Sequence, residues 1–280
     1  MDLKVVEMDK IDKIIEENFC LKFELDTLAE VLLRNESERW VPGYLHSATE
    51  HSHIVRYELA CKFSPGKEVI DIACGVGKGS FMLADMGDAI KVNGYDIQAN
   101  TIRYAKWRNN HINIDFNIGN AEELSITEKF DLAISFETIE HLKGYKKFIK
   151  NIYNCLRADG IFIVSTPIAS VPLDFNPANP YHVQEWGFSE FHKLLMNDFI
   201  IEEVHIQLYP FHTQLKSLGL PKRVFNKLMK IITRESGEKH SVTVPVSRKY
   251  PEIEKYESQY NEEDLGTVRF GYQILVAKKK

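Results

Sequence analysis

The chain has 280 residues, of which 44% are hydrophobic and 27% are charged, and its formal net charge at pH 7 is −5. This length is enough for one large hydrophobic core with appended helices, and the composition is that of an ordinary globular protein. The negative net charge argues against non-specific nucleic-acid binding as the main role of the protein. A local basic patch could still exist on a protein with this net charge.

The cysteines and the N-terminus restrict the cellular setting. Cys20, Cys61, Cys74 and Cys155 are scattered without a C-x-x-C spacing, so we expect neither a disulfide framework nor a thiolate zinc site. The first residues alternate in charge instead of forming an apolar signal core, and no run of about 18 apolar residues occurs. We therefore expect a cytoplasmic protein without a transmembrane segment.

The first 38 residues or so have the pattern of a helix. Apolar residues recur at helical spacing among Glu and Lys, at Ile11, Ile14, Ile15, Leu25, Leu28, Val31 and Leu32. This predicts a helical extension that packs on the core or on a sister subunit, which would make the protein a homo-oligomer; a substrate lid is the alternative. A second helix over residues 50–57 would place His53, Arg56 and Tyr57 within one turn.

The rest of the chain is organised around the stretch from Val69 to Ser80. Its apolar first half is short and β-branched, which is typical of a parallel strand covered on both faces. Gly75, Gly77 and Gly79 then allow a tight turn close to a ligand, and the amides that open the next helix face that ligand. The sequence therefore predicts a loop that binds a nucleotide cofactor.

The residues around these glycines narrow the choice of cofactor. Ser80 stands where the dinucleotide fingerprint G-x-G-x-x-G requires glycine, and Asp71 suits a ligand with a cationic amino-acid end. A second strand, Ile90 to Tyr95, ends in Asp96, about 20 residues after the glycines, where ribose hydroxyls are held. The alternative for Asp96 is to cap the following helix. Ile97 would then lie against the adenine ring.

Further strands and helices alternate to the end of the chain. A strand over 114–118 runs into Asn120, and a fourth strand within 129–136 runs into Glu137, Glu140 and His141. Ligands bind at the carboxyl ends of strands in an open α/β sheet, so Phe136 to His141 should line the site. If a helix begins near residue 138, these three polar side chains project from one face. Later elements are expected at 145–156 (a helix stopping at 158–160), 161–165, 188–195, 200–207 and 268–277.

Five ordered motifs resemble class I S-adenosylmethionine-dependent methyltransferases of the kind found with bacterial glycan and O-antigen biosynthesis enzymes. They are Glu-Arg-Trp-Val-Pro-Gly (38–43), Asp-Ile-Ala-Cys-Gly-x-Gly-x-Gly (71–79), Ser-Phe-Glu-Thr-Ile-Glu-His (135–141), Ser-Thr-Pro (165–167) and Asn-Pro-Tyr-His-Val (179–183). The resemblance implies an α/β fold with a Rossmann-like, doubly wound, seven-stranded sheet over residues 59–280 and an insertion, 208–266, before the last strand. Residues 1–58 would form the helical extension and a segment that covers the cofactor.

The resemblance also implies which residues bind S-adenosylmethionine. The set comprises Asp71, Ala73, Cys74, Gly75 and Gly77 for the methionine and ribose, Asp96 and Ile97 for the ribose and adenine, Asn120 and Ala121 for the adenine edge, Phe136 beside the cofactor, and Arg56 and Tyr57 for its carboxylate. Many relatives carry Asp where this chain has Asn120, whose side-chain oxygen can accept the same hydrogen bond without charge.

The leading hypothesis is O-methylation of a sugar hydroxyl on a glycan or nucleotide-linked precursor. An alcohol acceptor has to lose its proton during attack, and an imidazole with an unperturbed pKa near 6.5 suits a general base. His141, at the end of the fourth strand, and His182, after the fifth, are the candidate bases, with Glu137 beside them. For each histidine, a structural role in the core or on the surface is the alternative.

Two other hypotheses remain open. Glu137, Glu140 and His141 with the later His182 are similar to the metal site of small-RNA 3′-terminal 2′-O-methyltransferases, which implies Mg²⁺ or Mn²⁺ and an RNA acceptor. The same motif occurs in methyltransferases that use no metal, so a metal is not favoured. The third hypothesis is a non-catalytic partner protein that only binds the cofactor.

Overall fold

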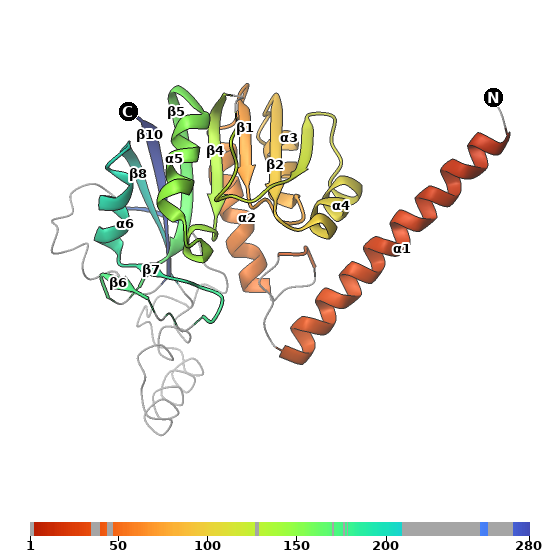
Figure 1. Ribbon diagram of the computed structural model, residues 1–280, viewed down its shortest axis with the longest axis horizontal. Coiled ribbons are helices and arrows are strands. Elements are labelled where there is room, and N and C mark those ends of the chain that lie inside the picture. Colours follow the sequence, from red (N-terminus) through yellow and green to blue (C-terminus); the bar gives the residue numbers. More distant parts are fainter. Residues whose placement is uncertain are drawn as a thin grey trace, which may run out of the picture.

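An eight-stranded sheet forms the centre of the computed structural model, which describes residues 3–34, 40–43, 47–126, 129–169, 171–175, 177, 179–208, 253–256 and 271–280. The strand order is β3-β2-β1-β4-β5-β10-β8-β9 (Figure 1). The strands are β1 (Glu68–Ile72), β2 (Lys91–Asp96), β3 (Ile114–Ile118), β4 (Phe130–Phe136), β5 (Leu156–Pro167), β8 (Phe199–Leu208), β9 (Glu254–Tyr256) and β10 (Gly271–Lys279). A separate ribbon pairs β6 (Leu173–Asp174) with β7 (Glu185–Trp186).

Helices connect the parallel strands and cover both faces of the sheet. They are α1 (Leu3–Arg34), α2 (Ser47–Cys61), α3 (Lys78–Asp85), α4 (Ala99–Arg108), α5 (Tyr145–Cys155), α6 (Phe188–Leu195) and a 3₁₀ turn, η1 (Ile139–His141). One apolar cluster packs α5 and α6 on the sheet, and another packs α2 and α3 on it. Because both faces are covered, β1 and β4 are almost continuously apolar, as the sequence predicts for central parallel strands.

The Rossmann-like α/β class predicted from the sequence is confirmed. Strands β1 to β5 are mutually parallel along the order 3-2-1-4-5, and β10 is antiparallel to both β5 and β8. These seven strands are the expected ones, and the short β9, from within the predicted insertion 208–266, adds an eighth at the edge beside β8. The boundary at residue 58 stays a prediction; α2 runs across it to Cys61. No helix in the described part is long and apolar enough to cross a bilayer.

Two local expectations are wrong. Helix α5 does not stop at the Ala-Asp-Gly turn of residues 158–160: it ends at Cys155, and the chain enters β5 at once. Lysine ammonium groups satisfy the last helical carbonyls instead of a glycine cap, since Lys279 Nζ donates to the carbonyls of Tyr153 and Leu156 at 2.6 and 2.7 Å, and Lys129 Nζ donates to that of Asn154. The second error, the shared face expected of Glu137, Glu140 and His141, concerns the site and is described below.

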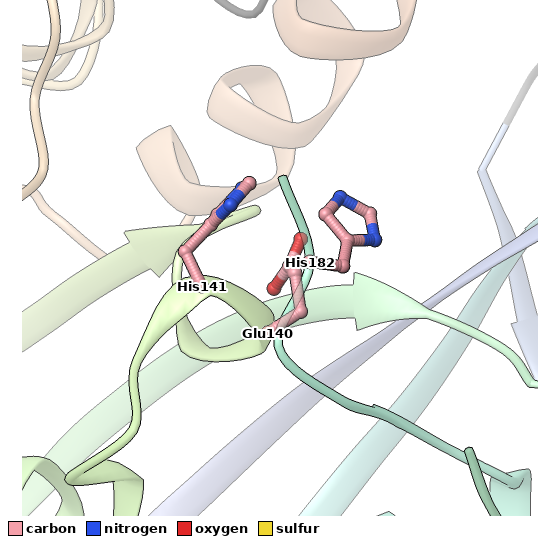
Figure 2. Close-up of side chains that lie close together, drawn as sticks. All are labelled: Glu140, His141 and His182. Atoms are coloured by element: carbon pink, nitrogen blue, oxygen red, sulfur yellow. The ribbon is translucent and has the colours of Figure 1, made fainter. Parts of the chain in front are cut away.

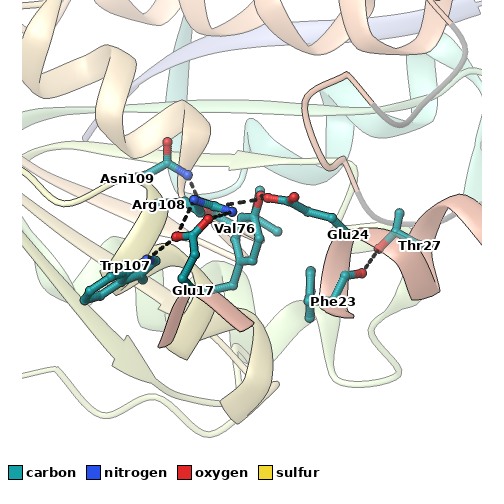
Figure 3. A network of polar contacts seen from close by, with 9 residues as sticks. Glu17, Phe23, Glu24, Thr27, Val76, Trp107, Arg108 and Asn109 are labelled. Atoms are coloured by element: carbon teal, nitrogen blue, oxygen red, sulfur yellow. Dashed lines mark hydrogen bonds and ion pairs between the residues drawn. The ribbon is translucent and has the colours of Figure 1, made fainter. Parts of the chain in front are cut away.

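Helix α1 is tied to α4 by a polar network (Figure 3). Glu24 accepts hydrogen bonds from the Tyr104 hydroxyl at 2.8 Å and from Arg108 Nε at 3.0 Å, and Glu17 accepts from Arg108 and Trp107. An apolar cluster also joins α1 to the loop after β1 and to α4. Its buried members are Cys20, Val41, Val76 and Tyr104. The predicted packing of the extension on the core is therefore present along this face of α1.

The described residues on either side of the insertion, Leu208 and Gly271, lie at the carboxyl edge of the parallel strands. Strand β8 runs parallel to β5, so Leu208 ends at that edge, and the antiparallel β10 begins there at Gly271, which pairs with Leu208. Most of the predicted insertion lies outside the described residues.

Candidate active site

A cavity of about 330 Å³ opens at the carboxyl ends of β1 to β4, where open α/β sheets bind ligands. This volume lies in the range of small-molecule pockets. Its walls combine segments far apart in sequence: Trp40, His53, Tyr57, Ala73, Cys74, Gly75, Val76, Lys78, Asp96, Ile97, Gln98, Gly119, Asn120, Ala121, Phe136, Glu137, Thr138, His141 and Leu142. Of the predicted site residues, Asp71, Gly77, Arg56, Glu140 and His182 are not in this lining.

The loop after β1 has the tight turn that the glycines predict, but its glycines differ in role. Ala73, Gly75 and Gly77 all have left-handed φ, at 61°, 56° and 79°. A Cβ on Gly75 would meet nothing within 4 Å, and this backbone lines the cavity. A Cβ on Gly77 would lie 2.4 Å from the Phe116 ring. Only Gly75 therefore combines the turn with an open approach for a ligand.

Gly79 serves helix packing. A Cβ there would lie 1.9 Å from the ring of Tyr57, so the glycine lets α2 press against the start of α3. Tyr57 in turn donates its hydroxyl to Asp71, 3.1 and 3.2 Å from the two carboxylate oxygens, and Ser80 Oγ donates at 2.6 Å. Asp71 is fully buried and away from the cavity. Burial raises the pKa of this carboxyl to about 6, against the opposing effect of its two donors.

Asp96 and Asn120 lie on the cavity wall, as their predicted roles require. Asp96 accepts from the backbone amides of Gly75 at 3.2 Å and Gln98 at 2.9 Å, so it links the first two loops. The N-cap of α4 is Gln98, and capping by Asp96 is not seen. The Asn120 side-chain oxygen accepts from the amide of Glu122 at 3.0 Å and keeps a second lone pair for another donor.

Aromatic side chains form the wall opposite the glycine loop. Tyr57 packs edge-on against Phe136 at 5.0 Å, and His53 stacks on Trp40 at 5.2 Å with 11° between the rings. Sequence reasoning missed Trp40 and His53 as site residues, although Trp40 lies in the quoted 38–43 motif and His53 on the same helix face as Tyr57. Burial, with the nearby charge of Arg56, lowers the pKa of His53 to about 3, so its ring is neutral.

Arg56 lies in the core behind the cavity. Its side chain is 1% exposed, its Nε donates to Gln207 Oε1 at 2.9 Å, and its guanidinium lies 4.1 Å from the centre of the Tyr272 ring. Its Nη1 is 3.4 Å from Glu137 Oε1. In this arrangement the positive charge of Arg56 lies beside the carboxylate of Glu137. A contact between Arg56 and the carboxylate of the cofactor remains a prediction.

Glu137 occupies an unusual backbone position at the end of β4. Its φ is 52°, and a short 3₁₀ helix, η1, begins after Thr138. A helical turn near residue 138 is therefore present, but Glu137 precedes it, so the expectation that Glu137, Glu140 and His141 share one face is wrong. Ser165 Oγ donates to Glu137 Oε1 at 2.7 Å, and the structure describes no hydrogen bond to Oε2. Burial raises the pKa of this carboxyl, with Arg56 and Ser165 opposing the shift. Backbone strain of this kind is common at functional sites.

His141 and His182 meet behind this turn, with Glu140 between them (Figure 2). Their rings are 4.8 Å apart and nearly perpendicular. His141 Nδ1 lies 3.0 Å from the carbonyl oxygen of Tyr181, which only accepts, so Nδ1 carries a proton, and in the neutral ring the lone pair is on Nε2. The predicted meeting of the two histidines is therefore observed, but only His141 lies on the cavity wall.

The contacts of His182 fix its tautomer as well. Asn179 Oδ1 accepts from the amide of Tyr181, so its Nδ2 faces and donates to His182 Nε2 at 2.9 Å. His182 Nδ1 then donates to Glu185 Oε1 at 2.6 Å. Both ring nitrogens of His182 therefore form hydrogen bonds, and its ring packs against the ring of His141.

Three of the four residues in the predicted metal set converge. One ligand atom each from Glu140, His141 and His182 lies within 4.8 Å of the others. Glu140 is fully buried; its Oε2 accepts from Thr166 Oγ1 at 3.1 Å, whereas Oε1 has no partner among the described residues. Burial and the nearby Glu137 raise the pKa of Glu140 well above its ordinary value. Glu137 itself is not part of this cluster and is held by Ser165 and Arg56.

Comparisons with known proteins agree with this geometry. The sheet order and the position of the cavity define the class I methyltransferase fold, and the N-methyltransferase NodS of Bradyrhizobium japonicum, solved with S-adenosyl-L-homocysteine, shares it with a TM-score of 0.53 and 13% identity over 90% of this chain and 98% of that one. The family model for a methyltransferase domain matches residues 63–236, more than half of the chain. The chain therefore belongs to this methyltransferase family, whose cofactor is S-adenosylmethionine.

Sequence relatives point to the same family. A Mycolicibacterium smegmatis protein named a probable S-adenosylmethionine-dependent methyltransferase is 32% identical over 162 residues, or 56% of this chain and 62% of that protein. A ubiquinone biosynthesis O-methyltransferase of Glaesserella parasuis is 35% identical over 109 residues, or 36% of this chain and 45% of that protein. The chain thus spans less than two thirds of the length of these relatives.

Proposed function

We propose that this chain is an S-adenosylmethionine-dependent methyltransferase that methylates a hydroxyl group of a sugar, on a glycan or a nucleotide-linked precursor. One observation carries the proposal: the imidazole of His141 lines the cofactor-sized cavity in the tautomer whose Nε2 has the lone pair. The proposed cofactor residues that line the same cavity are Tyr57, Ala73, Cys74, Gly75, Asp96, Ile97, Asn120, Ala121 and Phe136. Cytoplasmic location stays a prediction from the sequence.

The cavity would hold the reaction partners in line. When bound, S-adenosylmethionine supplies a methyl group on a positively charged sulfur. The acceptor oxygen forms the new bond to that carbon while the carbon–sulfur bond breaks, and alignment of the two is the main task of the protein. His141 Nε2 takes the hydroxyl proton, and the Tyr181 carbonyl, bonded to Nδ1–H, stabilises the imidazolium that results.

Glu137 supports a polyhydroxylated acceptor. Its Oε1 is held by Ser165 and Arg56, and the residue lines the cavity together with His141. A carboxylate fixed in this way accepts charge-assisted hydrogen bonds from acceptor hydroxyls. The choice of a sugar also rests on the resemblance of five sequence motifs to those of glycan-cluster methyltransferases, and the O-methyltransferase among the relatives favours transfer to oxygen.

Transfer of labelled methyl from S-adenosylmethionine into a cell extract, fractionated into glycan, RNA and lipid, tests the proposal. We expect label in the glycan fraction, with or without EDTA, and none with the His141→Ala variant. Label confined to RNA or lipid would reject the sugar acceptor. Cofactor binding without transfer to any fraction would instead favour the non-catalytic partner protein.

A metal-assisted reaction is the second candidate, because the buried Glu140 Oε1 lacks a partner beside His141 and His182. Oxygen and imidazole donors suit Mg²⁺ or Mn²⁺, which would lower the pKa of an acceptor hydroxyl. His182 Nε2 already accepts from Asn179, so the cluster fits an ion only if that amide moves away. Label in RNA that disappears with EDTA and returns with Mn²⁺ would favour this candidate over the first.

A further inference from the structure

Helix α1 carries a second apolar surface, on the side that faces away from α4. Ile11, Ile14, Leu21 and Leu25 are 55%, 61%, 45% and 63% exposed, far more than the residues of the opposite face, such as the fully buried Cys20. In Figure 1, α1 lies along one end of the molecule, beyond α4. The contact with α4 therefore leaves this surface uncovered by the described part of the chain.

The spacing of the exposed residues is that of a coiled-coil seam. Positions 11, 14, 18, 21, 25 and 28 alternate in steps of three and four, which is the a/d pattern of a heptad repeat, and all are apolar except Asn18. The first five are exposed, and Leu28 at the end of the pattern is half-buried. Ile15, 50% exposed at an e position, widens the seam. A surface helix that only packs on its own domain needs one apolar face, whereas α1 has two.

We propose that two copies of this chain associate through this seam as a parallel two-stranded coiled coil. In a parallel pair each a residue meets the same residue of the other helix, so Asn18 would face Asn18 of the second copy, and an amide can donate to and accept from its twin. A single Asn at an a position is a common way of fixing register and helix number. In an antiparallel pair, a residues meet d residues, and Asn18 would face leucine.

The charges beside the seam also fit a second copy. A g residue of one parallel helix reaches the e residue of the next heptad on its partner, which pairs Glu17 with Lys22 of opposite sign, twice by symmetry. Lys22 is exposed, and Glu17 keeps 43% of its side chain exposed despite its bond to Arg108. A lipid surface fits less well, because residues 10–30 carry six acidic and three basic side chains.

Sedimentation of the full chain over a range of concentrations tests the association. We expect a monomer–dimer equilibrium for the wild type and a monomer for the double variant Leu21→Glu/Leu25→Glu, whose exposed positions should leave the circular dichroism spectrum of the fold unchanged. Ile112→Glu removes an isoleucine that is 96% exposed elsewhere and should keep the dimer. A wild type that stays monomeric, or a dimer that survives the double variant, would overturn the proposal.

Cross-linking tests the orientation. Oxidised Ile11→Cys should form a covalent dimer, because equal positions meet in a parallel pair, whereas the native Cys20, buried against the core, should not cross-link. If only a mixture of Ile11→Cys with Leu28→Cys cross-links, the pair is antiparallel, because an a residue then meets a d residue, and the proposed geometry is wrong. A monomeric wild type that sediments with anionic vesicles would make the seam a lipid-binding surface instead.

Discussion

His141 owes its proposed role to a backbone carbonyl. The hydrogen bond from Nδ1 to the Tyr181 oxygen places the lone pair on Nε2, on a ring that lines the cavity. We predict that His141→Ala lowers kcat by about 10²–10⁴-fold, the usual contribution of a general base. The dissociation constant for S-adenosylhomocysteine, measured by calorimetry, should stay unchanged.

A matched control comes from a histidine elsewhere. His111 packs edge-on against Phe81 and is not in the cavity lining, so His111→Ala should keep full turnover. If His141→Ala turned over as fast as the wild type, His141 would have no part in the chemistry. An equal loss in both variants would point to a general effect of histidine removal on the fold.

The buried carboxyl of Asp71 makes stability depend on pH. Its pKa is about 6 in the folded chain and 3.8 in a model peptide, so the folded state holds a proton that the unfolded state loses as pH rises. Stability from this group is therefore present below pH 4 and falls as pH rises through 6. Relative to Asp71→Asn, the wild type should lose about 2 kcal/mol between pH 4 and pH 7.

Urea denaturation of both proteins at several pH values measures this difference. The Asn side chain does not titrate, so the Asp71→Asn variant shows how the free energy of unfolding depends on pH through all the other groups. The difference between the two proteins is then due to Asp71. A stability difference that stays constant from pH 4 to pH 7 would contradict the shifted pKa of Asp71.

At the scale of elements, the strands were predictable and the ends of elements were less so. Short apolar runs placed β1 to β4 within one or two residues. The signal is clearest in β1 and β4, which are central parallel strands covered on both faces. The C-terminus of α5 was misplaced because its carbonyls are satisfied by Lys279, more than a hundred residues away, and a distant donor leaves no local signal. The turn at Glu137 was missed because its left-handed φ has no glycine to mark it.

The lysine cap of α5 gives a prediction with a neighbouring control. Lys279→Ala leaves the carbonyls of Tyr153 and Leu156 without their donor and should cost about 1–3 kcal/mol of unfolding free energy. Lys278→Ala removes only an ion pair to Asp159, whose side chain is 78% exposed, and should change stability by less than about 1 kcal/mol. Equal losses in the two variants, measured by thermal denaturation, would contradict the cap.

For the whole molecule, the sequence could indicate the glycine loop and the acidic strand ends but not the full cavity. Asp96 and Asn120 are found by counting from the loop, because the fold fixes where strand ends meet. Trp40 and His53 reach the cavity from the segment before β1, and no spacing rule links them to it. The family resemblance implies that Arg56 binds the cofactor carboxylate, whereas in the fold its contacts are Gln207 of β8 and Tyr272 of β10.

Arg56 thereby links helix α2 to Glu137 in the candidate site and to strands β8 and β10, which border the insertion. Replacing it by leucine leaves the carboxylate of Glu137, only 17% exposed, without its positive neighbour. Removing one partner of a buried pair typically costs about 3–5 kcal/mol, because the other charge stays buried. We predict that Arg56→Leu lowers the free energy of unfolding by this amount. The double variant Arg56→Leu/Glu137→Gln should lose less, because it leaves no unpaired buried charge at position 137.

The pH dependence distinguishes this explanation from simple loss of packing. Burial already raises the pKa of Glu137 and Arg56 opposes that shift, so Arg56→Leu should raise it further. The folded variant then holds a proton that the unfolded chain releases, and its stability should fall as pH rises above the ordinary glutamate pKa of 4.5. With Gln at position 137 this additional fall should vanish. Two variants that differ from each other by the same amount at pH 5 and pH 8 would show that Arg56 stabilises the fold through packing alone.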